Sequence, residues 1–180
     1  MQFINNTKIL AGRIPPKVFV EVEDYAKEGR RREDPLGDPA VTSLKEEYRC
    51  EIPPKFLAFL QETIHTFFDL HKDECGFYGI TSDKIQLTDM WVNVMKKGDT
   101  HSPHIHGRSL YSFVLYINTT DNDAPFYYIE DGNLNSLGIH SGSQSMIMIF
   151  PSTMIHGVYP KTSDPERISV SGNISIRFDT

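Results

Sequence analysis

Gly98-Asp-Thr-His-Ser-Pro-His-Ile-His106, followed by the apolar run Leu110-Tyr-Ser-Phe-Val-Leu-Tyr-Ile-Asn118, is the stretch on which the interpretation of the fold depends. Three of the seven histidines of this 180-residue chain fall within six residues there. A fourth histidine, His156, follows in Phe150-Pro-Ser-Thr-Met-Ile-His-Gly157. The apolar run predicts a strand, and the histidines beside it indicate a metal site.

The sequence from Ile85 onward has the pattern of strands separated by turns. We predict strands over residues 85–95, 110–118, 124–129, 145–150, 155–159 and 167–178. The segments 121–123 and 130–137 are expected to be loops that border the site. Short strands after a mainly helical first half favour a β-sandwich or barrel with a helical buttress.

The first half of the chain carries the helical signals. Between Pro53 and His71 apolar residues recur mostly at intervals of three and four, and the prolines suit a helix start. Residues 15–31 are expected to form a second helix, although their opening alternation also suits a strand. We therefore expect one α+β, mainly β domain over residues 1–180, with a helical and loop part to residue 84 and a β core from residue 85.

Composition and charge exclude several classes of protein. The net charge of −6 argues against a general nucleic-acid surface. No window approaches the ~20 consecutive apolar residues of a membrane span. The N-terminus lacks the layout of a signal peptide, so we expect a cytoplasmic protein. Cys50 and Cys75 lack metal-site spacing and are expected to be reduced thiols.

The spacing of His104 and His106 suits a metal. In an extended segment these two residues project from the same face, and His156 would come from a distant strand. Such a set fixes a metal and leaves coordination positions open. A histidine pair at this spacing also occurs on surfaces without a metal, and the spacing alone leaves both interpretations open.

The last predicted strand, residues 167–178, separates polar from apolar residues by strict alternation. Arg167, Ser169 and Ser171 begin its polar face, which suits either a solvated surface or the wall of a polar cavity. In a cavity, a guanidinium with a hydroxyl two residues away would bind a carboxylate through charge-assisted hydrogen bonds.

Several short motifs, in this order and spacing, resemble the non-haem Fe(II), 2-oxoglutarate-dependent oxygenases. They are Trp91-Val-Asn93, Gly98-Asp99, Pro103-His-Ile-His106, Ser112 to Asn118, Phe150-Pro-Ser152, His156-Gly-Val158 and Arg167-Ile-Ser169. The sequence looks most similar to a poorly characterised branch common in bacteria and phages, and the resemblance covers residues 85–178. It implies a double-stranded β-helix, or jelly roll. We expect the protein in the cytoplasm of the organism or of a phage-infected host.

The resemblance also implies a set of site residues. His104 matches the first metal ligand of the family, and His156 matches the distal ligand. His106 stands where the family usually has a carboxylate. If it is not a ligand, water or a halide takes that position, or another residue such as Glu130 or Asp131 does. Arg167 and Ser169 match the residues that bind the far carboxylate of 2-oxoglutarate, whereas Tyr116 and Asn93 are weaker matches in the same pocket. No catalytic residue beyond the metal ligands is implied.

The implied function is an Fe(II)/2-oxoglutarate-dependent dioxygenase. It would take 2-oxoglutarate, O2 and an unidentified substrate, hydroxylate that substrate, and release succinate and CO2. One alternative is a three-histidine cupin-type dioxygenase that needs no 2-oxoglutarate. Another is a non-catalytic jelly roll whose histidines hold a metal. The cupin alternative leaves Arg167 and Ser169 without a role.

Overall fold

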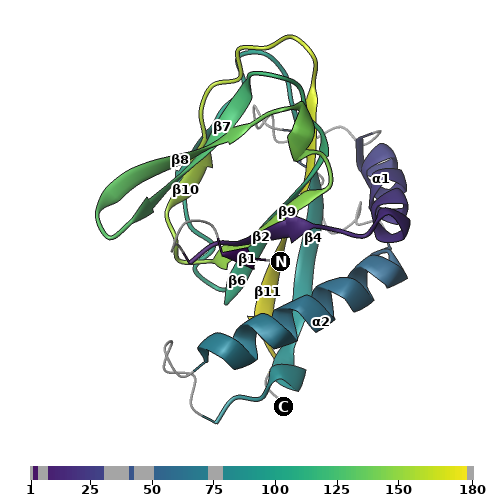
Figure 1. The fold of residues 1–180 in the computed structure, drawn as a ribbon, viewed down its shortest axis with the longest axis vertical. Coiled ribbons are helices and arrows are strands. Elements are labelled where there is room, and N and C mark those ends of the chain that lie inside the picture. The colour runs from purple at the N-terminus through teal and green to yellow at the C-terminus, as the bar shows by residue number, and fades with distance from the viewer. Residues whose placement is uncertain (1, 4–7, 31–40, 43–50, 73–78, 178–180) are drawn as a thin grey trace.

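The computed structural model describes residues 2–3, 8–30, 41–42, 51–72 and 79–177 (Figure 1). Both cysteines lie outside these residues. In chain order the elements are β1 (Gln2–Phe3), β2 (Leu10–Arg13), α1 (Pro16–Arg30), β3 (Val41–Thr42), α2 (Pro54–His71), η2 (Ser82–Lys84), β4 (Ile85–Met95), β5 (His101–His104), β6 (Tyr111–Asn118), β7 (Asp123–Glu130), β8 (Asn133–Ile139), η3 (Ser141–Ser143), β9 (Met146–Pro151), β10 (His156–Val158) and β11 (Arg167–Ile176).

The strands form two antiparallel sheets. The larger sheet has the order β1-β2-β9-β6-β11-β4-β3, and the smaller one has the order β5-β10-β7-β8. From β4 to β11 the chain crosses repeatedly between the sheets, so strands distant in sequence become neighbours. This winding is a double-stranded β-helix, and the prediction of a mainly β fold with a helical buttress is confirmed.

Strand β11 is an interior strand of the larger sheet. It pairs with β4 from Arg167↔Met95 to Ile176↔Ile85, and with β6 on its other side. Val170 and Ile174 on β11 are completely buried in the core cluster that includes the helices. Because side chains alternate along a strand, the predicted polar residues Arg167, Ser169 and Ser171 face the other way, into the space between the sheets.

The two helices cover one face of the larger sheet. Phe56, Leu60 and Ile64 of α2 are buried at helical spacing, and Pro54 occupies the first turn, where its missing N–H costs no hydrogen bond. These residues share a core cluster with Val22 of α1 and with strands β4, β6, β9 and β11. Figure 1 shows both helices on the side of β4 and β11, away from β7, β8 and β10. The helical layer therefore supports the sheet from outside.

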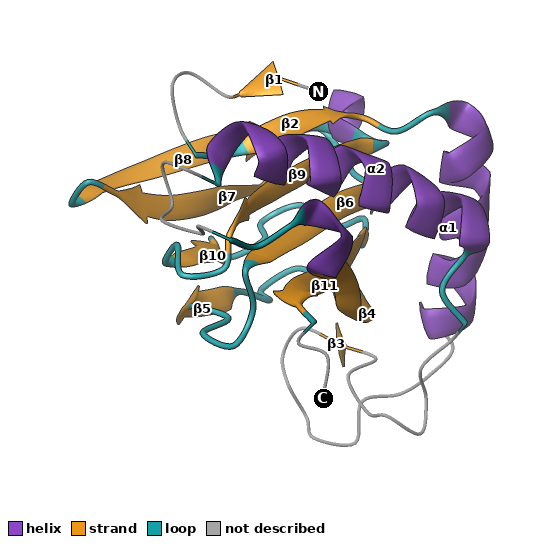
Figure 2. Ribbon diagram, turned by 90° about the horizontal axis from the view of Figure 1, so that it is seen from below, coloured by secondary structure: helices purple, strands orange, loops and turns teal. Residues whose placement is uncertain are grey.

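The predicted loop over residues 130–137 was wrong, because Asn133–Ile139 forms strand β8 (Figure 2). This strand is at the edge of the smaller sheet, and most of its residues are exposed or half-buried. An edge strand with little buried surface has no clear apolar alternation. The short strand β2, which pairs with β9, was missed as well. No described helix is long and apolar enough to cross a membrane.

Replacement of Phe56 by alanine tests the contact between helix and sheet. The Phe56 ring is completely buried, and its centroid lies 5.7 Å from that of Phe113 on β6. We expect Phe56→Ala to lower the free energy of unfolding by about 3–5 kcal/mol, measured by urea denaturation. Val20→Ala on the exposed face of α1 is the control, with an expected change within about 0.5 kcal/mol. Equal effects of the two variants would contradict this packing.

Candidate active site

A cavity of about 690 Å³ lies between the two sheets. Its lining comes from β4, β6, β9 and β11 of the larger sheet and from β5, β7 and β10 of the smaller one. All seven predicted site residues line it: Asn93, His104, His106, Tyr116, His156, Arg167 and Ser169. The fold therefore brings residues from five separate segments into one cavity.

Three histidines form a cluster at one part of this cavity. His104 on β5 and His156 on β10 are directly paired in the smaller sheet, and His106 follows two residues after His104. One ligand atom of each of the three lies within 4.8 Å of the others. The ring centroids are 4.4 Å apart for His104 and His156, and 5.2 Å apart for His106 and His156. A single metal ion fits between ligand atoms at this separation.

Hydrogen bonds to the backbone orient two of these rings. Nδ1 of His104 lies 2.8 Å from the carbonyl oxygen of Ser102, and Nδ1 of His156 lies 2.8 Å from that of Met154. A carbonyl oxygen can only accept, so each Nδ1 carries the proton and donates it. The unprotonated Nε2 of each ring is then free to bind a metal, the arrangement usual for histidine ligands.

The cluster favours neutral imidazoles. Burial, together with the neighbouring His104, lowers the pKa of His106 to about 4. Burial also lowers the pKa of His156 to about 3, despite the opposing effect of its hydrogen bond to Met154. Both rings are therefore neutral at pH 7, and a metal would not have to displace a proton from them.

His106 is held at the cluster by the backbone and by its neighbours. Its N–H donates to the carbonyl oxygen of Ser152 (2.8 Å), and its ring centroid lies 5.8 Å from that of Trp91. The two carboxylates considered in its place are at the β7–β8 turn, where Glu130 accepts a hydrogen bond from the Lys8 backbone N–H. Neither Glu130 nor Asp131 belongs to a metal-binding group among the residues that the structure describes.

The remaining predicted residues lie along the wall formed by the larger sheet. Ser169 on β11 is paired with Asn93 on β4 and with Tyr116 on β6, so these three side chains form one row across the sheet. Burial raises the pKa of Tyr116 to about 12, which keeps its hydroxyl protonated and able to donate a hydrogen bond. Arg167 lies on the same face of β11, two residues before Ser169, and its guanidinium carbon lies 5.8 Å from the centroid of the Tyr116 ring.

Arg167 is buried and only partly satisfied. Its Nη1 donates to the carbonyl oxygen of Ala124 (2.7 Å), and its Nη2 contacts Sδ of Met95 (2.5 Å). Its Nε has no hydrogen-bond partner among the described residues, and neither has Oδ1 of Asn93. Since a buried donor without a partner is costly, this site is suited to an acceptor such as the far carboxylate of 2-oxoglutarate.

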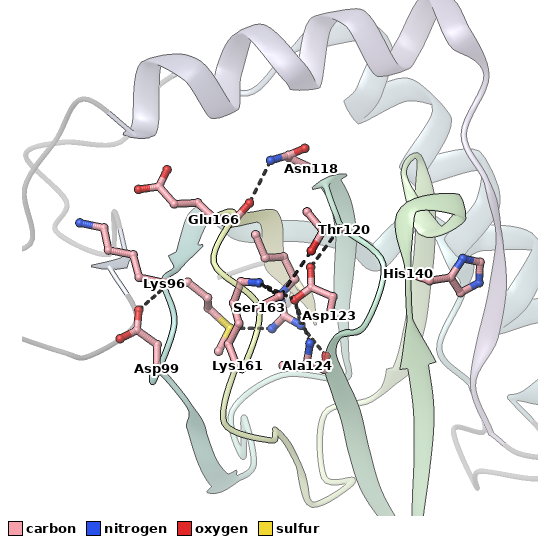
Figure 3. Close-up of polar contacts among 12 residues, drawn as sticks. Lys96, Asp99, Asn118, Thr120, Asp123, Ala124, His140, Lys161, Ser163 and Glu166 are labelled. Atoms are coloured by element: carbon pink, nitrogen blue, oxygen red, sulfur yellow. Dashed lines mark hydrogen bonds and ion pairs between the residues drawn. The ribbon is translucent and has the colours of Figure 1, made fainter.

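A polar cluster behind Arg167 was not predicted from the sequence. Asp123 and Lys161, both completely buried, form an ion pair beside the guanidinium (Figure 3). Asp123 had been assigned to a loop, and no local pattern distinguishes Lys161 from an ordinary surface lysine. His101 also lines the cavity, whereas His140 caps the short helix η3.

Residues 89–173 match the family described as "Putative 2OG-Fe(II) oxygenase". The segment that contains the candidate site therefore matches a 2OG-Fe(II) oxygenase family. This match includes every predicted site residue, and it does not favour the cupin-type or the non-catalytic alternative. The histidine cluster and the unpaired Nε of Arg167 fit the Fe(II) and 2-oxoglutarate that such oxygenases use. No curated protein matches the sequence.

Several solved structures have the same fold as this chain. A prolyl-4-hydroxylase from Pseudomonas putida is 18% identical with a TM-score of 0.62, over 96% of this chain and 94% of that one. A collagen prolyl hydroxylase of Paramecium Bursaria Chlorella virus-1, in complex with 2-oxoglutarate, is 12% identical with a TM-score of 0.63, over 96% and 98%. HygX from Streptomyces hygroscopicus, with nickel, 2-oxoglutarate and hygromycin B bound, is 11% identical with a TM-score of 0.63, over 98% and 86%.

The single tryptophan of the chain provides a test of the candidate metal site. Because Trp91 lies beside His106, binding of Co²⁺ or Ni²⁺ at the cluster should quench its fluorescence. Loss of one ligand should weaken metal binding, so we expect His106→Ala to raise the dissociation constant roughly tenfold or more.

His140→Ala is the matched control, because it removes an imidazole that does not line the cavity. Its metal titration should coincide with that of the wild-type protein. Identical titrations of the His106 and His140 variants would exclude His106 from the metal site.

Proposed function

We propose that His104, His106 and His156 hold Fe(II) through their Nε2 atoms, and that Arg167 and Ser169 bind the far carboxylate of 2-oxoglutarate. The observation that carries this proposal is a single cavity with a cluster of imidazoles and a buried guanidinium whose Nε lacks a partner. When bound, Fe(II) and 2-oxoglutarate supply the activation of O2, with succinate and CO2 as products. We assign hydroxylation as the outcome.

In this proposal the role of the protein is to bind the co-substrate and to orient it. Arg167 and Ser169 fix one end of the co-substrate, and the protonated hydroxyl of Tyr116 adds a donor to the same row. Asn93, which donates to the Ser171 hydroxyl (2.9 Å), contributes its unpaired Oδ1 as an acceptor. Positioning of this kind limits the geometries in which the co-substrate can bind.

Aromatic side chains shield the histidine cluster from water. The Phe150 ring centroid lies 4.7 Å from that of His156. The Phe126 ring stacks on the His156 ring, with 5.8 Å between their centroids. Both rings line the cavity. Apolar surroundings strengthen the electrostatic interactions of the bound groups and limit side reactions with water. His104, the more open ligand, marks the side from which a substrate would approach.

The substrate is not assigned. Prolyl hydroxylases and a protein crystallised with hygromycin B have the same fold, so the fold does not select a substrate class. The net charge of −6 disfavours a nucleic-acid base. The cytoplasmic location and the phage origin remain predictions from the sequence.

Anaerobic addition of Fe(II) and 2-oxoglutarate tests the proposed function. We expect a visible charge-transfer band that requires both components, together with calorimetric binding of 2-oxoglutarate to the metal-loaded protein. Arg167→Met should weaken this binding about 10- to 100-fold, the loss expected for a charge-assisted hydrogen bond in a buried site.

The same substitution at Arg177, an exposed residue just after β11, is the matched control and should leave binding unchanged. Absence of the band and of any 2-oxoglutarate affinity would overturn the proposed function. Oxygen consumption with no requirement for 2-oxoglutarate would favour a three-histidine cupin-type reaction instead.

A further inference from the structure

Lys161 is buried although it carries a formal positive charge. Its side chain is 0% exposed, and Nζ lies 3.2 Å from Oδ1 of Asp123, whose side chain is also 0% exposed. Nζ donates as well to the hydroxyl of Ser163. The backbone of Lys161 bonds on both sides to the β4–β5 turn, to Asp99 and Gly98. The lysine is therefore held in a fixed place beside Asp123 and Ser163 (Figure 3).

Stability does not account for this ion pair. Taking two charges out of water costs more than their attraction usually returns, so apolar residues of similar size commonly stabilise a protein at least as well. The position of the pair suggests another role. Oδ1 of Asp123 also lies 3.9 Å from Nη1 of Arg167, so one carboxylate lies close to two cations.

The two cations have different surroundings. Arg167 lines the cavity, whereas Lys161 does not. Besides Arg167, three donors contact the Asp123 carboxylate. They are Nζ of Lys161, the backbone N–H of Ala124 (2.8 Å to Oδ1) and the backbone N–H of Thr120 (3.3 Å to Oδ2). These donors occupy the carboxylate, so the N–H groups of Arg167 that face the cavity stay available.

We propose that Lys161 is a specificity residue of the co-substrate site: by pairing with Asp123 it keeps that carboxylate from neutralising Arg167. The formal charges of Lys161, Asp123 and Arg167 sum to one positive charge, which matches the single carboxylate at the far end of 2-oxoglutarate. Without Lys161 the sum is zero, and Asp123 competes with the co-substrate for the guanidinium. This inference rests on the proposed binding of that carboxylate by Arg167.

A calorimetric comparison of two ligands tests the proposal on the full-length protein loaded with Ni²⁺. The ligands are 2-oxoglutarate and 2-oxoglutaramate, in which a neutral amide replaces the far carboxylate. Lys161→Met should weaken binding of 2-oxoglutarate about 10- to 100-fold and leave the affinity for the amide nearly unchanged, so the preference for the carboxylate falls. A fold defect would weaken both ligands alike, and that result would overturn the proposal.

A second substitution separates competition by Asp123 from direct binding by Lys161. In the double variant Lys161→Met, Asp123→Asn the competing charge is gone and the net charge returns to one positive. The affinity for 2-oxoglutarate should recover to within about threefold of the wild-type value, because the carboxylate that competed for Arg167 has been removed. No recovery would mean that Lys161 binds the co-substrate itself, and would overturn the proposal.

Two further variants complete the design. Lys97→Met removes an exposed lysine that pairs with Asp164 at 3.2 Å in a nearby loop, and it should change neither affinity. Arg167→Met reports on the proposed function itself. If Arg167→Met weakens 2-oxoglutarate binding and Lys161→Met does not, only the role of Lys161 is wrong. If Arg167→Met has no effect, Arg167 does not bind the far carboxylate of 2-oxoglutarate, and the proposed function itself is wrong at this point.

Discussion

Strand β11 is hydrogen-bonded on both sides, to β4 and to β6, and this double pairing determines the position of the core and of the site. Alternation along β11 directs Val170 and Ile174 to the helices and Arg167 and Ser169 to the cavity. A slip of one residue would exchange these two faces. Gly172 allows the close approach of the strands, because a Cβ there would lie 2.5 Å from the backbone oxygen of Asp89.

The smaller sheet complements this arrangement. It places His104 and His156 side by side on β5 and β10, across the cavity from the row on the larger sheet. Both imidazole rings are oriented by backbone carbonyls two residues earlier in the chain. The histidine cluster is thus preorganised by one sheet and the proposed co-substrate end by the other, and closure of the sandwich sets the separation between them.

Charge is distributed unequally in the proposed site. Three neutral imidazoles provide no negative charge to balance Fe(II), whereas most relatives that the sequence resembles have a carboxylate among the ligands. The anion closest to the metal would then come from 2-oxoglutarate itself. At the other end of the cavity, Asp123 offsets one of two buried cations. A dianionic co-substrate is thereby balanced by positive charge at both of its ends.

Much of this organisation could be predicted from the sequence because it depends on local periodicity. The helix at Pro54–His71 and the strands Ile85–Met95 and Tyr111–Asn118 have strong apolar patterns, and their predicted bounds agree with the structure to within one residue. Alternation could not decide whether the polar face of β11 meets solvent or a cavity; the covering smaller sheet decides it.

Features set by long-range packing were not predictable. Strand β8 lacks an apolar face because it is an edge strand. The contacts among Asp123, Lys161 and Arg167 join residues far apart in the sequence, and nothing in their immediate neighbours indicates burial. His106 was the least certain ligand, since a histidine stands where a carboxylate was expected, and only the assembled cluster brings it together with His104 and His156.

A crystal structure of the protein with Ni²⁺ and 2-oxoglutarate, with the metal located by anomalous diffraction, tests the central claim most directly. The account predicts one metal ion bound by the Nε2 atoms of His104, His106 and His156, and the far carboxylate of 2-oxoglutarate on the guanidinium of Arg167. A metal bound without His106, or a co-substrate carboxylate away from Arg167, would contradict it.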